Sequence, residues 1–371
     1  MTQYYAEAEI PVCSFLSEAV EEWKRLDVPL LIWGAQNLGH LVADFLIKQG
    51  IQFVAFAVNR KYSAEAPKTM DNHPVVVLED YAAINKCAVL VAFRGWHDDL
   101  LDETTKKNIT HLYAYDFIGN LILRSDSVYP DRFPETYGDE LRELEKTLAD
   151  ELSIWSLRVF LRQRMRGDYS KEYDQGAAYF DREIIQLNDG EIFVDCGSLY
   201  GETSLEFIHQ MNTKKKTYAH IYAIEPNKTS AEIIKQNSLS WGGGTGDVSI
   251  LCCGVGEIEE QVRFACNEEN SSNSFISEEG TEIIDIRTID NIVGDKGATF
   301  IKMDIEGSEL SALKGAKWTI TQCRPKLAIC VYHKWNDLLT IPQYIQELHS
   351  DYRLYLRNYS PAGTELVLYA V

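Results

Sequence analysis

The chain has 371 residues, a length that predicts two or three domains, and 45% of them are hydrophobic, so packed cores can form. Acidic residues outnumber basic ones by 56 to 36, which gives a formal net charge of -20 at pH 7. Because this charge repels a nucleic-acid backbone and an anionic membrane surface, we expect no partner of either kind. No apolar run approaches the roughly 20 residues of a membrane span, and the acidic start MTQYYAEAEI lacks the features of a secretory signal, so we expect a cytoplasmic protein.

Residues 1–125 are predicted to form a small Rossmann-like α/β domain. The run PLLIWGAQNLGHLVADFLIKQGIQFVAFAVNR is typical of a strand, a glycine turn, an amphipathic helix and a second strand, and CAVLVAF and HLYAYDF predict further strands. Within the turn GAQNLG, Gln36 occupies the position at which a pyrophosphate approaches, and Asn59 replaces the usual ribose-binding acid. We therefore expect a degraded nucleotide site without NAD. A scaffold, dimerisation or acceptor-docking role and a small ligand such as a nucleotide sugar remain alternatives.

Residues 126–175 are predicted to be a helical connector. A segment rich in turn residues is followed by leucine and other apolar residues that recur at spacings of three and four. This periodicity predicts one long helix that carries Leu141, Leu144, Leu148, Leu152, Trp155 and Val159.

Residues 176–371 repeat a short apolar run, a glycine or polar turn and, in most cases, a helix, which is the pattern of a doubly wound parallel sheet. Thr203 with Glu206, and Thr229 with Glu232, fit capping boxes and predict helix starts. The end DYRLYLRNYSPAGTELVLYAV predicts an antiparallel hairpin. The eight cysteines include no CxxC pair, and we expect buried, reduced thiols.

A nucleoside site is predicted where the first two strands of this region end. Gly197 and Gly201 allow a tight turn and close backbone approach, Asp195 supplies a carboxylate, and Glu225 suits two ribose hydroxyls. NAD and S-adenosylmethionine both contain such a nucleoside. The spacing is G-x-x-x-G, with Leu199 in place of the glycine that admits a pyrophosphate, so a ligand without phosphates fits better.

The runs FVDCGSLYGETS, IEP and above all FIKMDIEGSELSALKGA resemble the FkbM family of S-adenosylmethionine-dependent methyltransferases over about residues 176–340. The resemblance implies a class I methyltransferase fold, a seven-stranded sheet whose last strand is antiparallel. It also implies that the methionine end of the cofactor is held near Asp195, Gly197 and Gly201, and the ribose by Glu225. Further cofactor contacts are implied for Cys253, Gly254 and Val255 at the adenine, and for Asp304.

Methyl transfer needs an aligned acceptor atom whose proton is removed. Candidate catalytic residues are Asp304, Glu306 and His333, and we rank His333 first because the ordinary pKa of histidine is closest to neutrality. Alternatives are that Asp304 caps a helix, that His333 is a loop histidine, and that Glu306 pairs with Lys302 or Lys334. The three candidates could also bind a divalent cation, but we assign no metal ligand.

These expectations describe an enzyme that O-methylates a hydroxyl of a sugar, a glycan precursor or a secondary metabolite. N-methylation of an amide or amine is the first alternative, and an inactive S-adenosylmethionine- or nucleotide-binding module is the second. The expected partner is a small-molecule or glycan acceptor, and a homodimer is left open.

Overall fold

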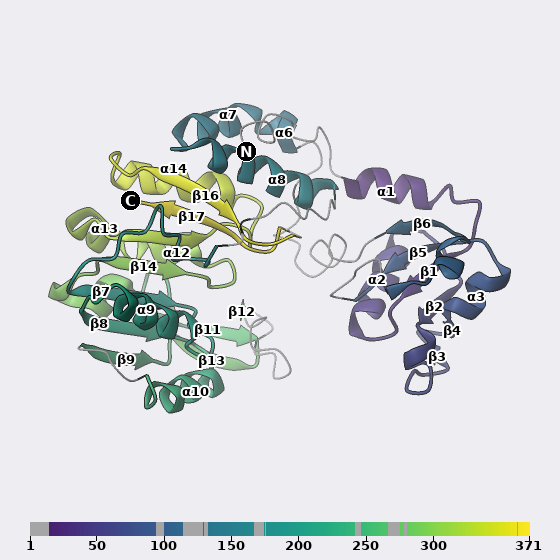
Figure 1. Cartoon of the computed structure of the whole chain (residues 1–371), viewed down its shortest axis with the longest axis horizontal. Helices are drawn as coiled ribbons and strands as arrows, with labels where there is room; N and C mark the ends of the chain where they lie inside the picture. Colours follow the sequence, from purple (N-terminus) through teal and green to yellow (C-terminus); the bar gives the residue numbers. More distant parts are fainter. Residues whose placement is uncertain are drawn as a thin grey trace.

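The computed structural model describes residues 15–93, 100–113, 129, 133–166, 174, 176–241, 246–265, 275–277, 280–361 and 363–371. Two α/β parts follow each other along the chain, and helices α6 to α8 come between them (Figure 1). This confirms the predicted fold class. Among the described residues, no helix combines the length and apolar character that crossing a membrane requires.

The N-terminal part contains a six-stranded sheet in the order β3-β4-β2-β1-β5-β6. Only the pair β3–β4 is antiparallel; the other neighbours are parallel. Apolar residues on both faces of the central strands are buried, which explains why these strands read as continuous apolar runs. The elements are α1 (Phe15–Trp23), β1 (Leu30–Trp33), α2 (Asn37–Lys48), β2 (Ala55–Val58), η1 (Arg60–Tyr62), β3 (Thr69–Met70), β4 (His73–Val77), α3 (Leu78–Ile84), β5 (Cys87–Val91), α4 (Glu103–Lys106) and β6 (Ile109–Tyr113).

Asn59, which stands where a dinucleotide fold keeps an acid, has a structural role. Its side-chain oxygen accepts a hydrogen bond from the Trp33 indole at 3.0 Å, and its amide donates to the Leu100 carbonyl at 3.2 Å. Gly34 has a φ of +134°, and a Cβ there would lie 2.5 Å from the Ala92 carbonyl oxygen. Packing therefore accounts for this turn without a ligand.

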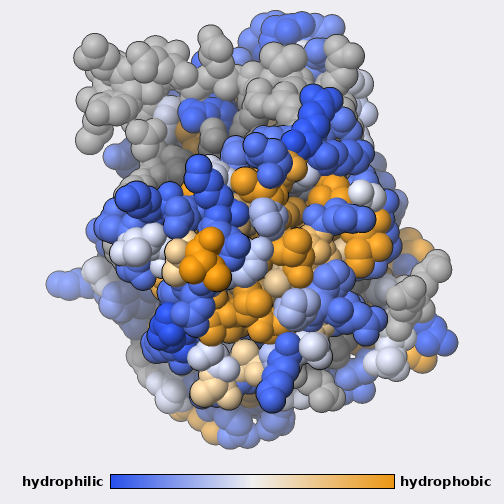
Figure 2. Space-filling model, turned by 90° about the vertical axis from the view of Figure 1, so that its right-hand side faces the viewer, coloured by the Kyte–Doolittle hydropathy of each residue, from blue (hydrophilic) through white to orange (hydrophobic). Residues whose placement is uncertain are grey.

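The face of the N-terminal part in Figure 2 carries a concentration of hydrophobic residues near its centre. Large hydrophobic side chains that are exposed in this part of the chain are Ile47, Val54, Tyr62, Ile84 and Leu112.

The described residues of the connector form three helices, so the predicted single helix is wrong. They are α6 (Phe133–Thr136), α7 (Gly138–Thr147) and α8 (Glu151–Arg166). The chain turns out of α7 at Leu148, whose ψ of 134° is extended. Leu148 there forms a bridge to Leu354, and the Ala149 N–H donates to the Leu354 carbonyl at 2.8 Å. Pairing with the C-terminal sheet thus overrides the helical periodicity.

The C-terminal part contains a seven-stranded sheet in the order β16-β17-β15-β14-β7-β8-β9. All neighbours are parallel except those of β17, which runs antiparallel to β15 and β16, so the predicted terminal hairpin is confirmed. The elements are β7 (Glu191–Cys196), α9 (Glu202–Thr213), β8 (Tyr218–Ile224), α10 (Lys228–Ser238), β9 (Asp247–Leu251), β14 (Phe300–Met303), α12 (Glu309–Lys314), α13 (Lys317–Cys323), β15 (Lys326–Cys330), α14 (Asp337–Leu348), β16 (Leu354–Asn358) and β17 (Leu366–Ala370).

A smaller four-stranded sheet, in the order β10-β13-β11-β12, is inserted between β9 and β14. Its strands are β10 (Gly254–Val255), β11 (Glu260–Ala265), β12 (Phe275–Ile276) and β13 (Glu282–Arg287), followed by α11 (Ile289–Val293) and η5 (Gly294–Lys296).

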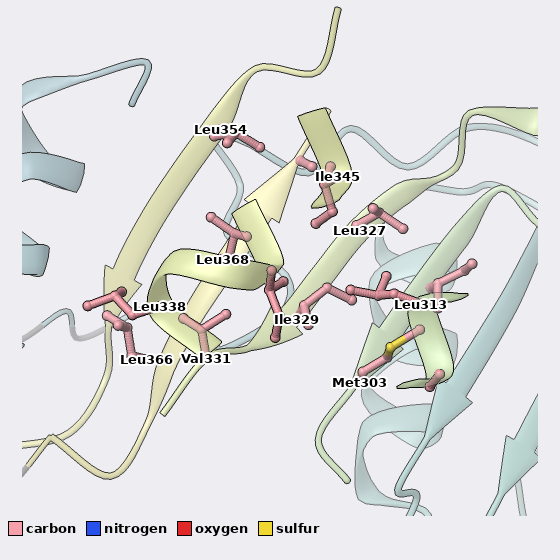
Figure 3. Close-up of a cluster of buried hydrophobic side chains, with 14 of the residues drawn as sticks. Met303, Leu313, Leu327, Ile329, Val331, Leu338, Ile345, Leu354, Leu366 and Leu368 are labelled. Atoms are coloured by element: carbon pink, nitrogen blue, oxygen red, sulfur yellow. The ribbon is translucent and has the colours of Figure 1, made fainter. Parts of the chain in front are cut away.

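The core beneath the C-terminal sheet supports the strand ends at which the candidate site lies. Met303 of β14, Ile329 of β15 and Leu368 of β17 pack in one cluster with Leu338 and Ile345 of α14 (Figure 3). All five are fully buried, so β14 and β15 are held rigidly up to the residues that follow them.

Both predicted capping boxes are wrong, because each helix begins earlier. The N-cap of α9 is Gly201, at a φ of +91° and without a side-chain cap. The N-cap of α10 is Asn227, whose side-chain oxygen accepts from the Ser230 N–H at 3.0 Å. Thr203 and Thr229 therefore lie inside the first turns.

The six described cysteines are free thiols. Cys87, Cys196, Cys253 and Cys330 are buried, which confirms the prediction for them, whereas Cys252 and Cys323 are exposed. Cys13 and Cys266 lie outside the described residues.

Candidate functional site

The carboxyl ends of β7, β8, β14 and β15 meet at one edge of the seven-stranded sheet, because these strands are parallel neighbours. Asp195, on β7, is fully buried. One of its oxygens lies 3.2 Å from the Lys302 ammonium, and the other accepts from the Ser204 hydroxyl at 2.7 Å. Burial alone would lower the pKa of Lys302, but the charges of Asp195 and Asp304 raise it. Lys302 thus pairs with Asp195 inside the protein.

The loop after β7 touches the loop after β14. Gly197 has a φ of +78°, and a Cβ on it would lie 1.9 Å from the Asp304 carbonyl oxygen, so only glycine fits. Gly201 packs in the same way against the Trp241 ring. These two predicted cofactor residues therefore shape the loop through their backbone.

Glu225, directly after β8, connects two loops. Its carboxylate accepts the Leu199 N–H at 3.0 Å and the Asn227 N–H at 2.9 Å, and the residue is 6% exposed. Burial raises the pKa of Glu225 to about 7. A carboxylate has about four lone-pair sites, so two remain available for ligand hydroxyls when Glu225 is ionised.

The segment predicted to contact an adenine lies at the start of the inserted sheet. Cys253 and Val255 are both 4% exposed, and their side chains belong to the hydrophobic core. A Cβ on Gly254 would lie 2.6 Å from the Ile286 side chain. Contact with a ligand at this segment therefore has to come from the backbone.

The structure brings together the three predicted catalytic residues. His333 Nε2 lies 3.4 Å from Asp304 Oδ1 and 3.8 Å from Glu306 Oε1. Glu306 has a φ of +56°, in the left-handed region that favours glycine, so the turn after β14 carries strain at this position. The side chains of Asp304 and Glu306 are 29% and 28% exposed, whereas that of His333 is 4% exposed.

Glu309, the first residue of α12, completes this group and was missed from the sequence. It is fully buried, and its Oε1 accepts hydrogen bonds from His333 Nδ1 and from the Ile305 N–H, both at 2.9 Å. The available signal was a third carboxylate in the run D-I-E-G-S-E. The N-cap of α12 is Ser308, so the structure does not place Asp304 as the cap of that helix.

His333 carries a positive charge at neutral pH. Burial lowers its pKa, but the negative charge of Glu309 and its hydrogen bond, together with Asp304 and Glu306, raise it to about 9. The argument that ranked His333 first, a pKa close to neutrality, is therefore wrong. An imidazolium ring surrounded by three carboxylates has to lose its proton before it can act as a base.

Asp304 receives hydrogen bonds from two tyrosines that sequence reasoning missed. The Tyr179 hydroxyl donates to Oδ2 at 2.9 Å, and the Tyr332 hydroxyl donates to Oδ1 at 3.1 Å. Burial would raise the pKa of Asp304, but the charges of His333 and Lys302 and the hydrogen bonds from Tyr179 and Cys330 lower it. Tyr332 adjoins His333 in the sequence, whereas nothing in the sequence links Tyr179 to Asp304.

Asp304, Glu309 and His333 form one group, among the described residues, whose donor atoms lie within 4.8 Å of one another, as ligands of a single metal ion do. Ligation would need a neutral imidazole. The hydrogen bond to Glu309 and the raised pKa of His333 favour the protonated ring, so proton and metal compete for this place.

Comparison with known proteins finds one family model, described as the Methyltransferase FkbM domain, which matches residues 195–360. All the predicted cofactor and catalytic residues lie in this range, and Tyr179 lies before it. No curated protein matches the chain.

A solved structure described as the methyltransferase FkbM from Methylobacillus flagellatus KT is similar over the whole chain. The TM-score is 0.73 at 22% sequence identity, and the match covers 100% of this chain and 96% of the other. An rRNA methylase from Streptococcus thermophilus matches with a TM-score of 0.31 at 14% identity, over 50% of this chain and 87% of the other. A precorrin-6y C5,15-methyltransferase from Geobacter metallireducens GS-15 matches with a TM-score of 0.30 at 13% identity, over 53% and 94%. The first match supports the fold of both parts of the chain.

Proposed function

We propose that this chain, whose residues 195–360 match the Methyltransferase FkbM domain, transfers the methyl group of S-adenosylmethionine to a hydroxyl of a sugar, a glycan precursor or a secondary metabolite. The observation that carries the proposal is the contact between Gly197 and Asp304. It brings the loop expected to hold the cofactor against the strand end that carries the charged catalytic group.

In this proposal the cofactor lies along the ends of β7 and β8. Ionised Glu225 accepts the ribose hydroxyls, and the backbone near Gly197 and Gly201 holds the methionine end. The sulfonium of S-adenosylmethionine is a cation, and the carboxylates of Asp304, Glu306 and Glu309 exceed the positive charges of His333 and Lys302 around it. Their field favours a positively charged ligand.

The bound cofactor supplies a methyl group on a leaving sulfur, which departs as a neutral thioether. The acceptor oxygen forms the new bond to carbon, and the protein has to take the hydroxyl proton. Because Nδ1 of His333 donates to Glu309, Nε2 is the nitrogen that can take it once the ring is neutral. A cation bound nearby lowers the pKa of His333, so cofactor binding favours the neutral ring.

Asp304 and Glu306 lie beside Nε2 and stabilise the imidazolium that results. Asp304 is the alternative base. Its carboxylate is ionised at neutral pH, but its lowered pKa makes it the weaker proton acceptor.

The proposal is tested first by calorimetry of the full chain with S-adenosylhomocysteine, then with labelled S-adenosylmethionine and a panel of hydroxyl and amine acceptors. We expect saturable binding and label on oxygen. Label only on nitrogen would favour N-methylation. Binding without turnover on any acceptor would favour an inactive binding module, and no binding would contradict the proposal.

The bounds 1–125, 126–175 and 176–371 stay a prediction, as do a cytoplasmic location and the role of the N-terminal part as a scaffold, a dimerisation surface or a docking surface for the acceptor.

A further inference from the structure

Tyr179 reaches the site from outside the matched family domain. It lies between α8 and β7, before residue 195, where the family match begins. Its hydroxyl donates to Asp304 Oδ2 at 2.9 Å. The other oxygen of Asp304, Oδ1, faces His333 Nε2 at 3.4 Å. The hydrogen bond from Tyr179 thus occupies one side of the carboxylate and leaves the other toward the histidine.

The backbone of Tyr179 is held in a conformation that bulky residues rarely adopt. Its φ is +68°, in the left-handed region. The Tyr179 N–H donates to the Tyr369 hydroxyl at 2.9 Å, and that hydroxyl lies 2.7 Å from the Tyr359 hydroxyl. Such strain persists only where the surroundings enforce it.

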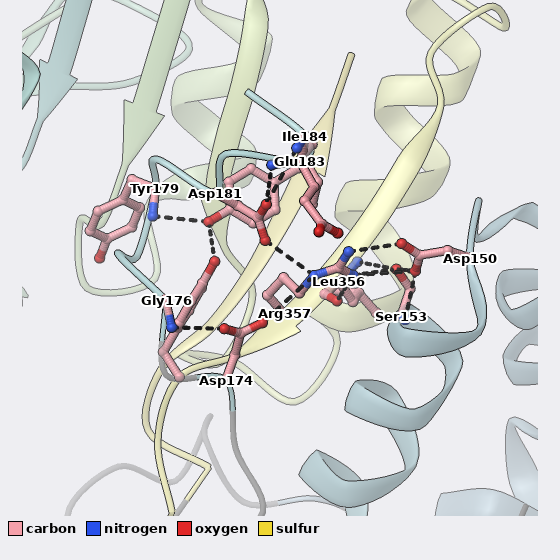
Figure 4. A network of polar contacts seen from close by, with 12 residues as sticks. Asp150, Ser153, Asp174, Gly176, Tyr179, Asp181, Glu183, Ile184, Leu356 and Arg357 are labelled. Carbon is pink, nitrogen blue, oxygen red and sulfur yellow. Dashed lines mark hydrogen bonds and ion pairs between the residues drawn. The ribbon is translucent and has the colours of Figure 1, made fainter. Parts of the chain in front are cut away.

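The surroundings that enforce it centre on Arg357, a buried residue of β16 (Figure 4). Its guanidinium lies 3.3 Å from Asp181, two residues after Tyr179, and 2.8 Å from Asp150, just before α8. In Figure 4 the Tyr179 ring points away from Arg357. The Tyr179 N–H is engaged by the Tyr369 hydroxyl. The network therefore fixes the backbone and leaves the side chain directed elsewhere.

The Tyr179 ring is fixed on the site side as well. Lys302 Nζ lies 5.2 Å from the ring centroid, a cation–π contact with the lysine that pairs with Asp195. Burial raises the pKa of Tyr179 well above its ordinary value, so the hydroxyl keeps its proton. It is a permanent donor to Asp304.

We propose that Tyr179 is a positioning residue of the methyl-transfer site, whose hydroxyl prevents the Asp304 carboxylate from rotating and keeps Oδ1 toward His333. The role in methyl transfer rests on the function proposed above. The positioning itself, in which Tyr179 holds Asp304 toward His333, does not depend on that function.

The first test needs no ligand. Tyr179→Phe removes the hydroxyl and keeps the ring, and Tyr359→Phe is the matched control because its hydroxyl belongs to the same network without touching Asp304. The ¹⁵N resonance of His333 Nε2, assigned with His333→Gln, is recorded at one pH. We expect it to move in Tyr179→Phe and to stay in Tyr359→Phe. An unmoved resonance in Tyr179→Phe overturns the proposal.

The second test measures S-adenosylhomocysteine affinity by calorimetry. We expect about tenfold weaker binding for Tyr179→Phe, because the Asp304 carboxylate, expected to contact the cofactor, is no longer held in place, and a change of less than about twofold for Tyr359→Phe. In an Asp304→Asn background, Tyr179→Phe should have no further effect. Equal effects in both backgrounds would show that the hydroxyl acts through packing and overturn the proposal.

Thermal unfolding checks that each variant is folded. If Tyr179→Phe does not fold, Tyr332→Phe, which removes the donor to Oδ1, tests whether Asp304 depends on phenol donors. A moved His333 resonance in that variant supports such dependence, and an unmoved one overturns it. Failure of the wild-type chain to bind S-adenosylhomocysteine would contradict the proposed function, whereas the resonance would still report on the contact.

Discussion

His333 Nδ1 donates to Glu309 Oε1 across 2.9 Å, and both side chains are almost entirely excluded from solvent. A buried carboxylate beside a buried imidazole stabilises the charged ring. This pair links the start of α12 to the end of β15, and through the Ile305 N–H it also holds the turn after β14. The proton that charges the His333 ring therefore affects both the chemistry of the site and the stability of this edge of the sheet.

The first prediction concerns stability and pH. The pKa of His333 is raised from 6.5 to about 9 on folding. Its stabilising contribution is therefore fully present below pH 6.5 and is lost as the pH rises through about 9. At about 1.4 kcal/mol per pKa unit, the wild type should lose at most about 3.5 kcal/mol of unfolding free energy over that window. Urea unfolding at pH 6 and pH 9.5 measures it.

His333→Gln should reduce this pH dependence. A pH dependence that is the same in wild type and His333→Gln would show that other groups cause it.

The second prediction concerns Glu225. Glu225→Ala should weaken S-adenosylhomocysteine binding substantially, because two hydrogen bonds to a charged acceptor are lost, each worth about 1.5 to 3 kcal/mol. Glu232→Ala, at an exposed acid of α10, is the control. Since the pKa of Glu225 is about 7 and the ionised form accepts hydroxyls, affinity should fall as the pH drops below about 7. Calorimetry across pH 5.5 to 8.5 measures the dissociation constant of S-adenosylhomocysteine. An unchanged dissociation constant in Glu225→Ala would show that Glu225 does not bind the cofactor.

The third prediction concerns the buried pair of Lys302 and Asp195. Lys302→Met leaves a fully buried carboxylate without its cation, and breaking a buried pair in this way costs about 3 to 5 kcal/mol of unfolding free energy. Adding Asp195→Asn should recover part of the loss. Urea unfolding measures both, with Lys235→Met, at an exposed pair, as control. A loss below about 1 kcal/mol in Lys302→Met would contradict this account.

The fourth prediction is that the N-terminal part does not bind NAD. Gln36 stands where a pyrophosphate would approach, and the Asn59 side chain is bonded to Trp33 and Leu100 instead of facing a ribose. Titration with NADH followed by fluorescence should show no saturation. Saturable micromolar binding, abolished by Gly34→Val, would contradict it.

Local patterns predicted the sheet of the C-terminal part because each strand is a short apolar run and its turn residues are chemically distinctive. The same reasoning brought Asp304, Glu306 and His333 to one edge, since parallel strands end together. Reasoning from local patterns failed where a contact or a charge depends on residues that are distant in the sequence. Tyr179 meets Asp304 across 125 positions, and the charge on His333 depends on Glu309, a residue that local pattern treats as part of a helix.

The last prediction concerns catalysis. If the acceptor is a hydroxyl, His333→Ala should lower the single-turnover rate by about 10² to 10⁴, the usual contribution of a general base, and leave cofactor affinity almost unchanged.

Because His333 has to be neutral to take the proton, and its pKa in the free protein is about 9, kcat/KM of the wild type should rise with pH toward that value. Because the bound cationic cofactor lowers the pKa of His333, the rise in kcat should occur at a lower pH than the rise in kcat/KM. Asp304→Ala is the comparison: a base at Asp304, whose pKa is lowered, gives no such alkaline rise. Near wild-type rates in both variants would exclude both as the base, and methylation of an already neutral nitrogen, which needs no strong base, would then explain the site better.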